Sequence, residues 1–205
     1  MPPKSKKTYK TLRFFDFCVK INAIKRTQKN FKGVLTMKLY FKQDLKTFER
    51  DERGYLICPT GDYTAITHFR YDVKCKFGAG SKFGEKCEFA ERTEFGDGCR
   101  FDVYTKFGNY SKFGDGCKFY ANCKFGNQSK FGNNCKFSQI NEFEYGCKFG
   151  DNTEFGVGCN IGDSAIIGNC SKFGKWSRLG LDVKFGDNCT FDECFILVPM
   201  KQSND

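Results

Sequence analysis

Residues 75–98 read CKFGAG SKFGEK CEFAER TEFGDG, and this six-residue period continues without insertion or deletion to Cys194. Twenty hexads follow one another, and the third position is Phe in 17 of them. The fourth position is Gly in 14 hexads, and the first is Cys, Ser or Thr in 17. A fixed period this strict is typical of a repeat architecture, in which each unit buries its apolar face against the next.

The alternation inside each hexad predicts a short strand. Positions one and three point to one side of an extended segment, and position two points to the other. A small residue and a Phe therefore face inward, while a charged residue faces solvent. We expect Gly at position four to supply the backbone freedom that a corner needs. Three strands and three corners make an 18-residue coil, so the sequence predicts an all-β, three-sided parallel β-helix of about 6.7 coils over residues 75–194.

This pattern resembles the hexapeptide-repeat superfamily, whose motif is an aliphatic residue, Gly, two variable residues and a small residue before the next strand. The resemblance covers residues 75–194 and implies a left-handed β-helix, although Phe replaces the usual Leu, Ile or Val. Many members are acyltransferases with a His in the coil, and members that act as carbonic anhydrases hold zinc through three His. This chain has one His, His68, before the first hexad. We therefore expect no catalytic residue, no metal and no other cofactor.

Charge divides the chain into parts. Residues 1–74 carry 17 Lys and Arg against 7 Asp and Glu, whereas residues 75–205 carry 17 of each. We expect a basic N-terminal arm and a β-rich cap in residues 1–74, the β-helix in 75–194, and a C-terminal cap and tail in 195–205. In the cap, residues 34–41 alternate so that inward positions fall on Leu35, Met37, Leu39 and Phe41.

Cysteine usage and hydropathy indicate a cytoplasmic protein without a membrane partner. No run of 18 apolar residues occurs, and the first residues lack the apolar stretch of a secretory signal. Nine of the 13 Cys occupy the first hexad position, where they supply core volume as small apolar side chains. Cys99, Cys117 and Cys135 are expected to stack in one inward column, and Cys170 and Cys194 are expected at corners.

The second of the three faces, which begins with Ser81–Lys86 and recurs every 18 residues, differs from the others. Four of the six hexads without Gly at position four lie on it. Exposed, contiguous apolar surface indicates a surface that something covers. The cover is either the N-terminal segment or a symmetry mate, or another macromolecule that uses Tyr and Trp as anchors. We expect the edge after this face to be a partner-binding strip made of Asp102, Val103, Tyr104, Tyr120, Ile140, Val157 and Trp176.

Two groups of basic residues are candidate contacts for anions or nucleic acid. Position two of the second face contributes Arg100, Lys118 and Lys136. The simpler interpretations are a solubilising arm and solvated lysines that keep strand edges from aggregating. The N-terminal arm contributes Lys4, Lys6, Lys7, Lys10, Arg13, Lys25, Arg26 and Lys29.

Together these features favour a non-catalytic protein that docks on a protein or nucleoprotein target, with nucleic acid bound through the basic arm. A viral or mobile-element inhibitor of a host nucleic-acid enzyme would have this character. Two alternatives stay open. One is an architectural homo-oligomer, in which the edge forms a trimer and the rod is a spacer. The other is an acyltransferase variant that uses His68.

Overall fold

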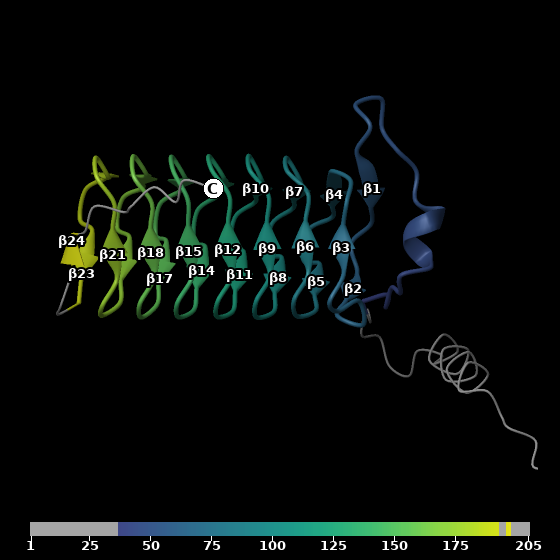
Figure 1. Ribbon diagram of the computed structural model, residues 1–205, viewed down its shortest axis with the longest axis horizontal. Helices are drawn as coiled ribbons and strands as arrows, with labels where there is room; N and C mark the ends of the chain where they lie inside the picture. The colour runs from purple at the N-terminus through teal and green to yellow at the C-terminus, as the bar shows by residue number, and fades with distance from the viewer. Residues whose placement is uncertain (1–36, 193–195, 198–205) are drawn as a thin grey trace, which may run out of the picture. The chain divides into compact units, whose positions relative to one another are not determined.

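The computed structural model describes residues 37–192 and 196–197. Strands of two or three residues form three parallel sheets of eight strands each. The chain is an all-β parallel β-solenoid of about eight turns, whose coils lie side by side along one axis (Figure 1). The predicted three-sided parallel β-helix is confirmed.

The three sheets correspond to the three faces of the hexad pattern. Sheet 1 contains β1 (Leu56–Cys58), β4 (Cys75–Phe77), β7 (Glu94–Phe95), β10 (Lys112–Phe113), β13 (Lys130–Phe131), β16 (Lys148–Phe149), β19 (Ile166–Ile167) and β22 (Lys184–Phe185). Sheet 2 contains β2 (Asp62–Tyr63), β5 (Lys82–Phe83), β8 (Arg100–Phe101), β11 (Lys118–Phe119), β14 (Lys136–Phe137), β17 (Glu154–Phe155), β20 (Lys172–Phe173) and β23 (Thr190–Phe191). Sheet 3 contains β3 (Arg70–Tyr71), β6 (Glu88–Phe89), β9 (Lys106–Phe107), β12 (Lys124–Phe125), β15 (Glu142–Phe143), β18 (Asn160–Ile161), β21 (Arg178–Leu179) and β24 (Ile196–Leu197).

The register shows an 18-residue coil throughout the hexads. Lys118 of β11 is paired with Arg100 on one side and Lys136 on the other. The sheets also extend to the N-terminal side of Cys75, because β1, β2 and β3 pair in parallel with β4, β5 and β6. The first coil is less regular: Leu56 pairs with Cys75, which is 19 residues further on.

Phenylalanine rings fill the interior in columns, one column for each sheet. Phe119 stacks on Phe101 at 4.9 Å and on Phe137 at 4.8 Å between ring centroids, with interplanar angles of 5° and 7°. Rings of neighbouring sheets meet edge to face, as Phe113 and Phe119 do at 5.0 Å and 86°. Both geometries suit the quadrupole of an aromatic ring. The inward position of the Phe residues is thus confirmed, apart from the last two, Phe185 and Phe191, which are exposed.

Small polar residues occupy the first hexad position because each finds a hydrogen-bond acceptor at the corner. The Ser111 hydroxyl donates to the Gly108 carbonyl at 2.7 Å, and the Thr105 hydroxyl donates to the Asp102 carbonyl at 2.8 Å. The Cys117 thiol, which is fully buried, donates to the Gly96 carbonyl of the preceding coil at 3.5 Å. These bonds offset the cost of burying a polar group.

The left-handed backbone conformation of each corner belongs to position six of the hexad, not to position four. Position six has positive φ in each hexad from 75 to 188, as at Gly98 (67°) and Asn134 (58°), and the N–H groups of Gly98 and Asn134 donate to carbonyls of the following coil. Position-four glycines do not have positive φ. They are needed for space, because a Cβ on Gly114 would lie 2.7 Å from the backbone nitrogen of Asp97. The expectation that position four supplies corner freedom was wrong.

Residues ahead of the first coil cover the start of the aromatic columns. Tyr40 is buried and stacks on Tyr63 at 4.8 Å, and Tyr63 stacks in turn on Phe83. The alternation predicts that Met37, Leu39 and Phe41 point inward, but all three are only half-buried, and Leu35 lies outside the described residues. Leu39 instead forms a parallel bridge with Asp62, and a short 3-10 helix, η1 (Asp44–Thr47), follows.

Candidate binding surface

The apolar residues predicted for one edge lie there in the structure. The turns after sheet 2, called the second corner here, carry Val103 and Val157 at position five and Tyr104, Ile140 and Trp176 at position six. Tyr120 stands one step earlier, at position four of β11's hexad. Trp176 is 61% exposed and Tyr120 54% exposed, whereas Val103 is half-buried. These residues, without Asp102, are called the apolar strip below.

Three members of the apolar strip adopt a backbone conformation that ordinary side chains avoid. Tyr104, Ile140 and Trp176 have φ of 59°, 57° and 58°. The left-handed region costs roughly 1–2 kcal/mol for a residue with a Cβ, and a β-branched residue such as Ile140 is a clear outlier there. The first corner, which follows sheet 1, uses Gly or Asn at this position in six of seven turns of the hexads: Gly80, Gly98, Gly116, Asn134, Asn152 and Asn188.

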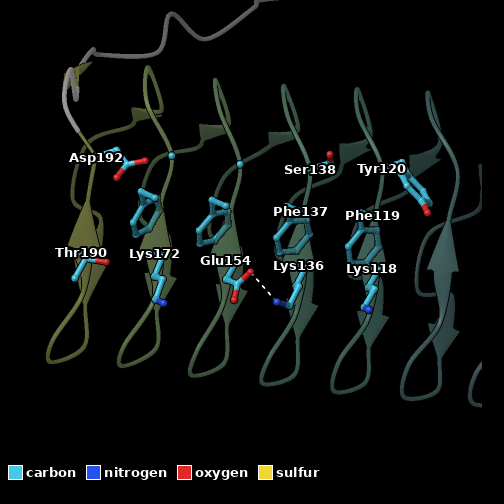
Figure 2. Close-up of a pocket in the computed structure, with 14 residues that line it drawn as sticks. Lys118, Phe119, Tyr120, Lys136, Phe137, Ser138, Glu154, Lys172, Thr190 and Asp192 are labelled. Carbon is cyan, nitrogen blue, oxygen red and sulfur yellow. Dashed lines mark hydrogen bonds and ion pairs between the residues drawn. The ribbon is translucent and has the colours of Figure 1, made fainter.

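A groove of about 550 Å³ runs along the outer face of sheet 2 beside the apolar strip (Figure 2). Outward side chains of successive strands form one side of it: Lys118, Lys136, Glu154, Lys172 and Thr190. Tyr120 and Asp192 lie at its two ends in Figure 2. Gly156 and Gly174 lie between them and leave that part of the groove without side chains.

The outward charges of sheet 2 are arranged differently from those of sheet 3. In sheet 3, Lys106 Nζ lies 2.8 Å from Glu88 Oε1, and Lys124 Nζ lies 2.7 Å from Glu142 Oε2. The hydrogen bond from Lys106 holds the pKa of Glu88 below its usual value. Sheet 2 instead places Lys82, Arg100, Lys118 and Lys136 in four successive strands, called the basic column here.

Only one member of the basic column has an acidic partner among the described residues. Lys136 Nζ lies 2.8 Å from Glu154 Oε2. Lys82, Arg100 and Lys118 make no ion pair with any residue in 37–192. Like charges directly opposite each other on neighbouring strands are destabilising. These three cations are therefore a candidate anion site.

Exposed apolar residues also occur at the third corner, which follows sheet 3. Tyr110, Tyr145 and Leu181 lie there and are exposed. Their places at positions five and six of third-face hexads could have identified them from the sequence. They do not border the sheet 2 groove.

Side-chain ladders along the first and third corners distinguish them from the second corner. At the first corner, Asp115 N–H donates to Asp97 Oδ1 at 2.9 Å and Asn133 N–H donates to Asp115 Oδ1 at 2.7 Å. At the third corner, Asn127 N–H donates to Asn109 Oδ1. The second corner has Glu, Val, Ala, Gln, Val and Lys at the same position, and its Val103, Ala121 and Val157 have no side-chain acceptor with which to continue a ladder.

His68 lies in the first of the turns that make up the second corner, in the coil before the hexads begin. It has φ of 50°, its N–H bonds to the Glu85 carbonyl, and its Nδ1 lies 4.0 Å from Glu85 Oε1. Its side chain is exposed. This position is the equivalent, one coil earlier, of Lys86, so His68 belongs to the same edge as Tyr104 and Trp176.

The predicted inward column of Cys99, Cys117 and Cys135 is confirmed, since all three are fully buried. Cys170 is exposed at the first corner, as expected. Burial raises the pKa of Cys123 and Cys147 to about 12 and that of Cys87 and Cys159 to about 11. Within the column itself, hydrogen bonds with Cys117 lower the pKa of Cys99 and Cys135, but all three thiols are shut off from solvent and pack as core residues.

Some predicted features lie outside the described residues. These are Cys194 and all the N-terminal basic residues, from Lys4 to Lys29. Across residues 37–192, no group of three His, Cys, Asp or Glu side chains is arranged to hold a metal ion. The same part of the chain contains no long apolar helix of the kind that crosses a bilayer.

Comparison of the chain with known families, proteins and structures found no match. No protein-family model matches the chain, and no curated protein or solved structure is significantly similar to it.

Proposed function

We propose that this protein is a non-catalytic binding protein that docks on a macromolecular partner through the apolar strip. The observation that carries the proposal is the presence of Tyr104, Ile140 and Trp176 in the left-handed region, on an exposed edge. The fold does not require them, because Gly and Asn close the same turn at the first corner at lower cost. Arg92, Tyr110 and Gln128 of the third corner have the same positive φ, so the support comes from the backbone conformation combined with the large exposed side chains of the strip.

The composition of the strip supports this proposal. Tyr and Trp dominate the energetics of protein interfaces because they bury a large apolar area with little loss of rotamer freedom. Their places along the second corner span coils from Val103 to Trp176, so a partner would contact several coils at once. An inhibitor of a host nucleic-acid enzyme, encoded by a virus or mobile element, is one protein of this class.

We further propose that the chain is a phenylalanine-rich relative of the hexapeptide-repeat proteins. The support is the 18-residue coil built from three hexads. The left-handed sense of the coil stays a prediction. We also propose a reducing, cytoplasmic setting, because the core uses Cys at its first hexad position as a small apolar residue.

The proposal is tested by capture from a lysate of the protein's source cells, with the full chain as bait. Tyr120→Ala and Trp176→Ala should each lose the captured macromolecule. Tyr145→Ala is the matched control, because Tyr145 is also 54% exposed but lies at the third corner. Capture that survives both strip variants, or that Tyr145→Ala also removes, would contradict the proposal.

Self-association is the alternative that the same variants separate. If the strip joined copies of this chain, light scattering would give an oligomer mass that Trp176→Ala reduces to that of a monomer. That result would support the architectural homo-oligomer in place of a foreign partner.

A further inference from the structure

We infer that the outer face of sheet 2 binds single-stranded nucleic acid. The phosphates lie over the basic column, and bases stack on aromatic side chains of the apolar strip. This inference rests on the proposed function, because it names the chemistry of the partner that docks at that edge.

The basic column provides the phosphate site. Adjacent strands of a sheet are roughly 4.8 Å apart, so Lys82, Arg100, Lys118 and Lys136 place a cation at that interval along the solenoid. Three of the four have no acidic partner among residues 37–192. A polyanion that follows the column relieves their mutual repulsion and releases its own counterions.

The groove and the strip provide the base site. Tyr120 follows Lys118 by two residues on the same outward side, so their Cα atoms lie roughly 6.6 Å apart. Figure 2 shows Tyr120 at the end of the groove and the lysines along its side. Of the apolar strip, Tyr120 is the residue that lines the groove, together with Lys118, Lys136 and Lys172 and the Glu154 and Asp192 carboxylates. Cations beside an exposed aromatic ring are the combination that binds single strands without sequence preference.

The pairing of cations with aromatic rings favours a single strand over a duplex or an acidic protein. A duplex presents phosphates but keeps the faces of its bases stacked inside, so Tyr120 and Trp176 would gain nothing from it. Carboxylates of a protein would satisfy the basic column but offer the rings no flat apolar partner. A single strand presents both a phosphate and an open base face at each nucleotide.

Sheet 1 is the competing surface that the experiment has to separate from sheet 2. Lys112, Lys130 and Lys148 also lie in three successive strands. The first corner, on one side of them, carries the Asp97, Asp115 and Asp151 carboxylates and no aromatic residue at position five or six. The third corner, on their other side, carries the exposed Tyr110 and Tyr145. The carboxylates of the first corner also border sheet 2, and Glu154 and Asp192 line its groove, so we expect the polyanion to follow the basic column from Lys82 to Lys118, where no acidic partner is bound in the described part of the chain.

The chain contains its own reporter for this binding mode, because Trp176 is the only tryptophan. The full chain is titrated with oligo(dT) and oligo(U) 20-mers at 50 and 200 mM salt, and Trp176 emission and oligonucleotide anisotropy are both recorded. We expect quenching of Trp176 in step with the anisotropy rise. Tyr120→Ala should weaken binding roughly 5- to 150-fold, while Tyr145→Ala leaves it unchanged.

Two lysines supply a matched test of the phosphate site. Lys118 and Lys130 are both exposed, both lie in a Lys-Phe strand, and both have basic neighbours in the strands on either side. Lys118→Ser should reduce the slope of log affinity against log salt by about 0.7, and Lys130→Ser should not. The N-terminal basic residues contribute equally to both variants.

Three outcomes would overturn the inference. They are no binding at 50 mM salt, binding without a change in Trp176 emission, and equal effects of Lys118→Ser and Lys130→Ser. If oligonucleotides fail but Trp176→Ala still abolishes capture of a protein from the lysate, the proposed function stands and this inference falls. If neither readout depends on the strip, both fall.

Discussion

Lys118 lies directly opposite Lys136 on the neighbouring strand of sheet 2, and only Lys136 has an acidic partner. Lys118→Glu would replace two repulsive neighbours, Arg100 and Lys136, by two attractive ones. We expect a gain in unfolding free energy of about 0.2–1 kcal/mol at low salt, since the group is exposed. Urea denaturation at 20 mM and 500 mM salt measures it, and the gain should disappear at the higher salt. A loss of stability at low salt would contradict the charge arrangement.

Ile140 provides a test of the strain at the second corner. Asn tolerates positive φ better than a β-branched residue does, so Ile140→Asn should raise the free energy of unfolding by about 1 kcal/mol. The reverse substitution can be made one coil earlier at the second corner, where Asn122 occupies the equivalent position with φ of 60°. Asn122→Ile should lower stability by a similar amount. Thermal denaturation of both variants measures the pair, and a destabilised Ile140→Asn would show that Ile140 serves the fold rather than a partner.

Gly114 and Gly116 lie in one corner and are required for different reasons. A Cβ on Gly114 would lie within 3 Å of the Asp97 backbone, so Gly114→Ala should cost about 1–3 kcal/mol by overpacking. Gly116 has open space around it but φ of 66°. Gly116→Asn should therefore be nearly neutral, as Asn134 and Asn152 occupy the equivalent positions. Equal destabilisation of both variants in urea would refute this distinction.

Buried thiols should make the solenoid sensitive to alkali. The folded pKa of Cys147, about 12, lies above the value near 9 of an exposed thiol, so its contribution to stability is complete below pH 9. That contribution is lost as pH rises from about 9 to about 12, at up to about 1.4 kcal/mol per pH unit. Cys147→Ser should lessen the fall in unfolding free energy between pH 8 and 10.5. Ser is a suitable replacement because Ser111 and Ser129 occupy the same column. An unchanged pH dependence in this variant would argue against the burial.

The sequence predicted the coil, the inward Phe residues and the location of the apolar strip, because these follow from periodicity alone. It could not predict the first coil, in which Leu56 pairs 19 residues away and Tyr40 covers Tyr63, because no hexad repeats there. It also assigned the special backbone conformation of the corner to the wrong hexad position. Gly predominates at position four, yet the positive φ belongs to position six, and the crowding at Gly114 arises from a residue 17 positions earlier. The 18-residue spacing indicates which lysines lie opposite glutamates, as for Lys106 with Glu88 and Lys136 with Glu154, but the ion-pair distances depend on side-chain geometry that spacing does not specify.

The most direct measurement of the docking surface is photo-crosslinking from inside it. A benzophenone side chain is placed at position 176, and in a second protein at position 145, and both full chains are irradiated in a lysate of the source cells. Our account predicts a discrete adduct from position 176 that is absent from position 145, and nuclease or protease sensitivity of the adduct identifies the partner's class. No adduct from position 176, or the same adduct from both positions, would contradict it.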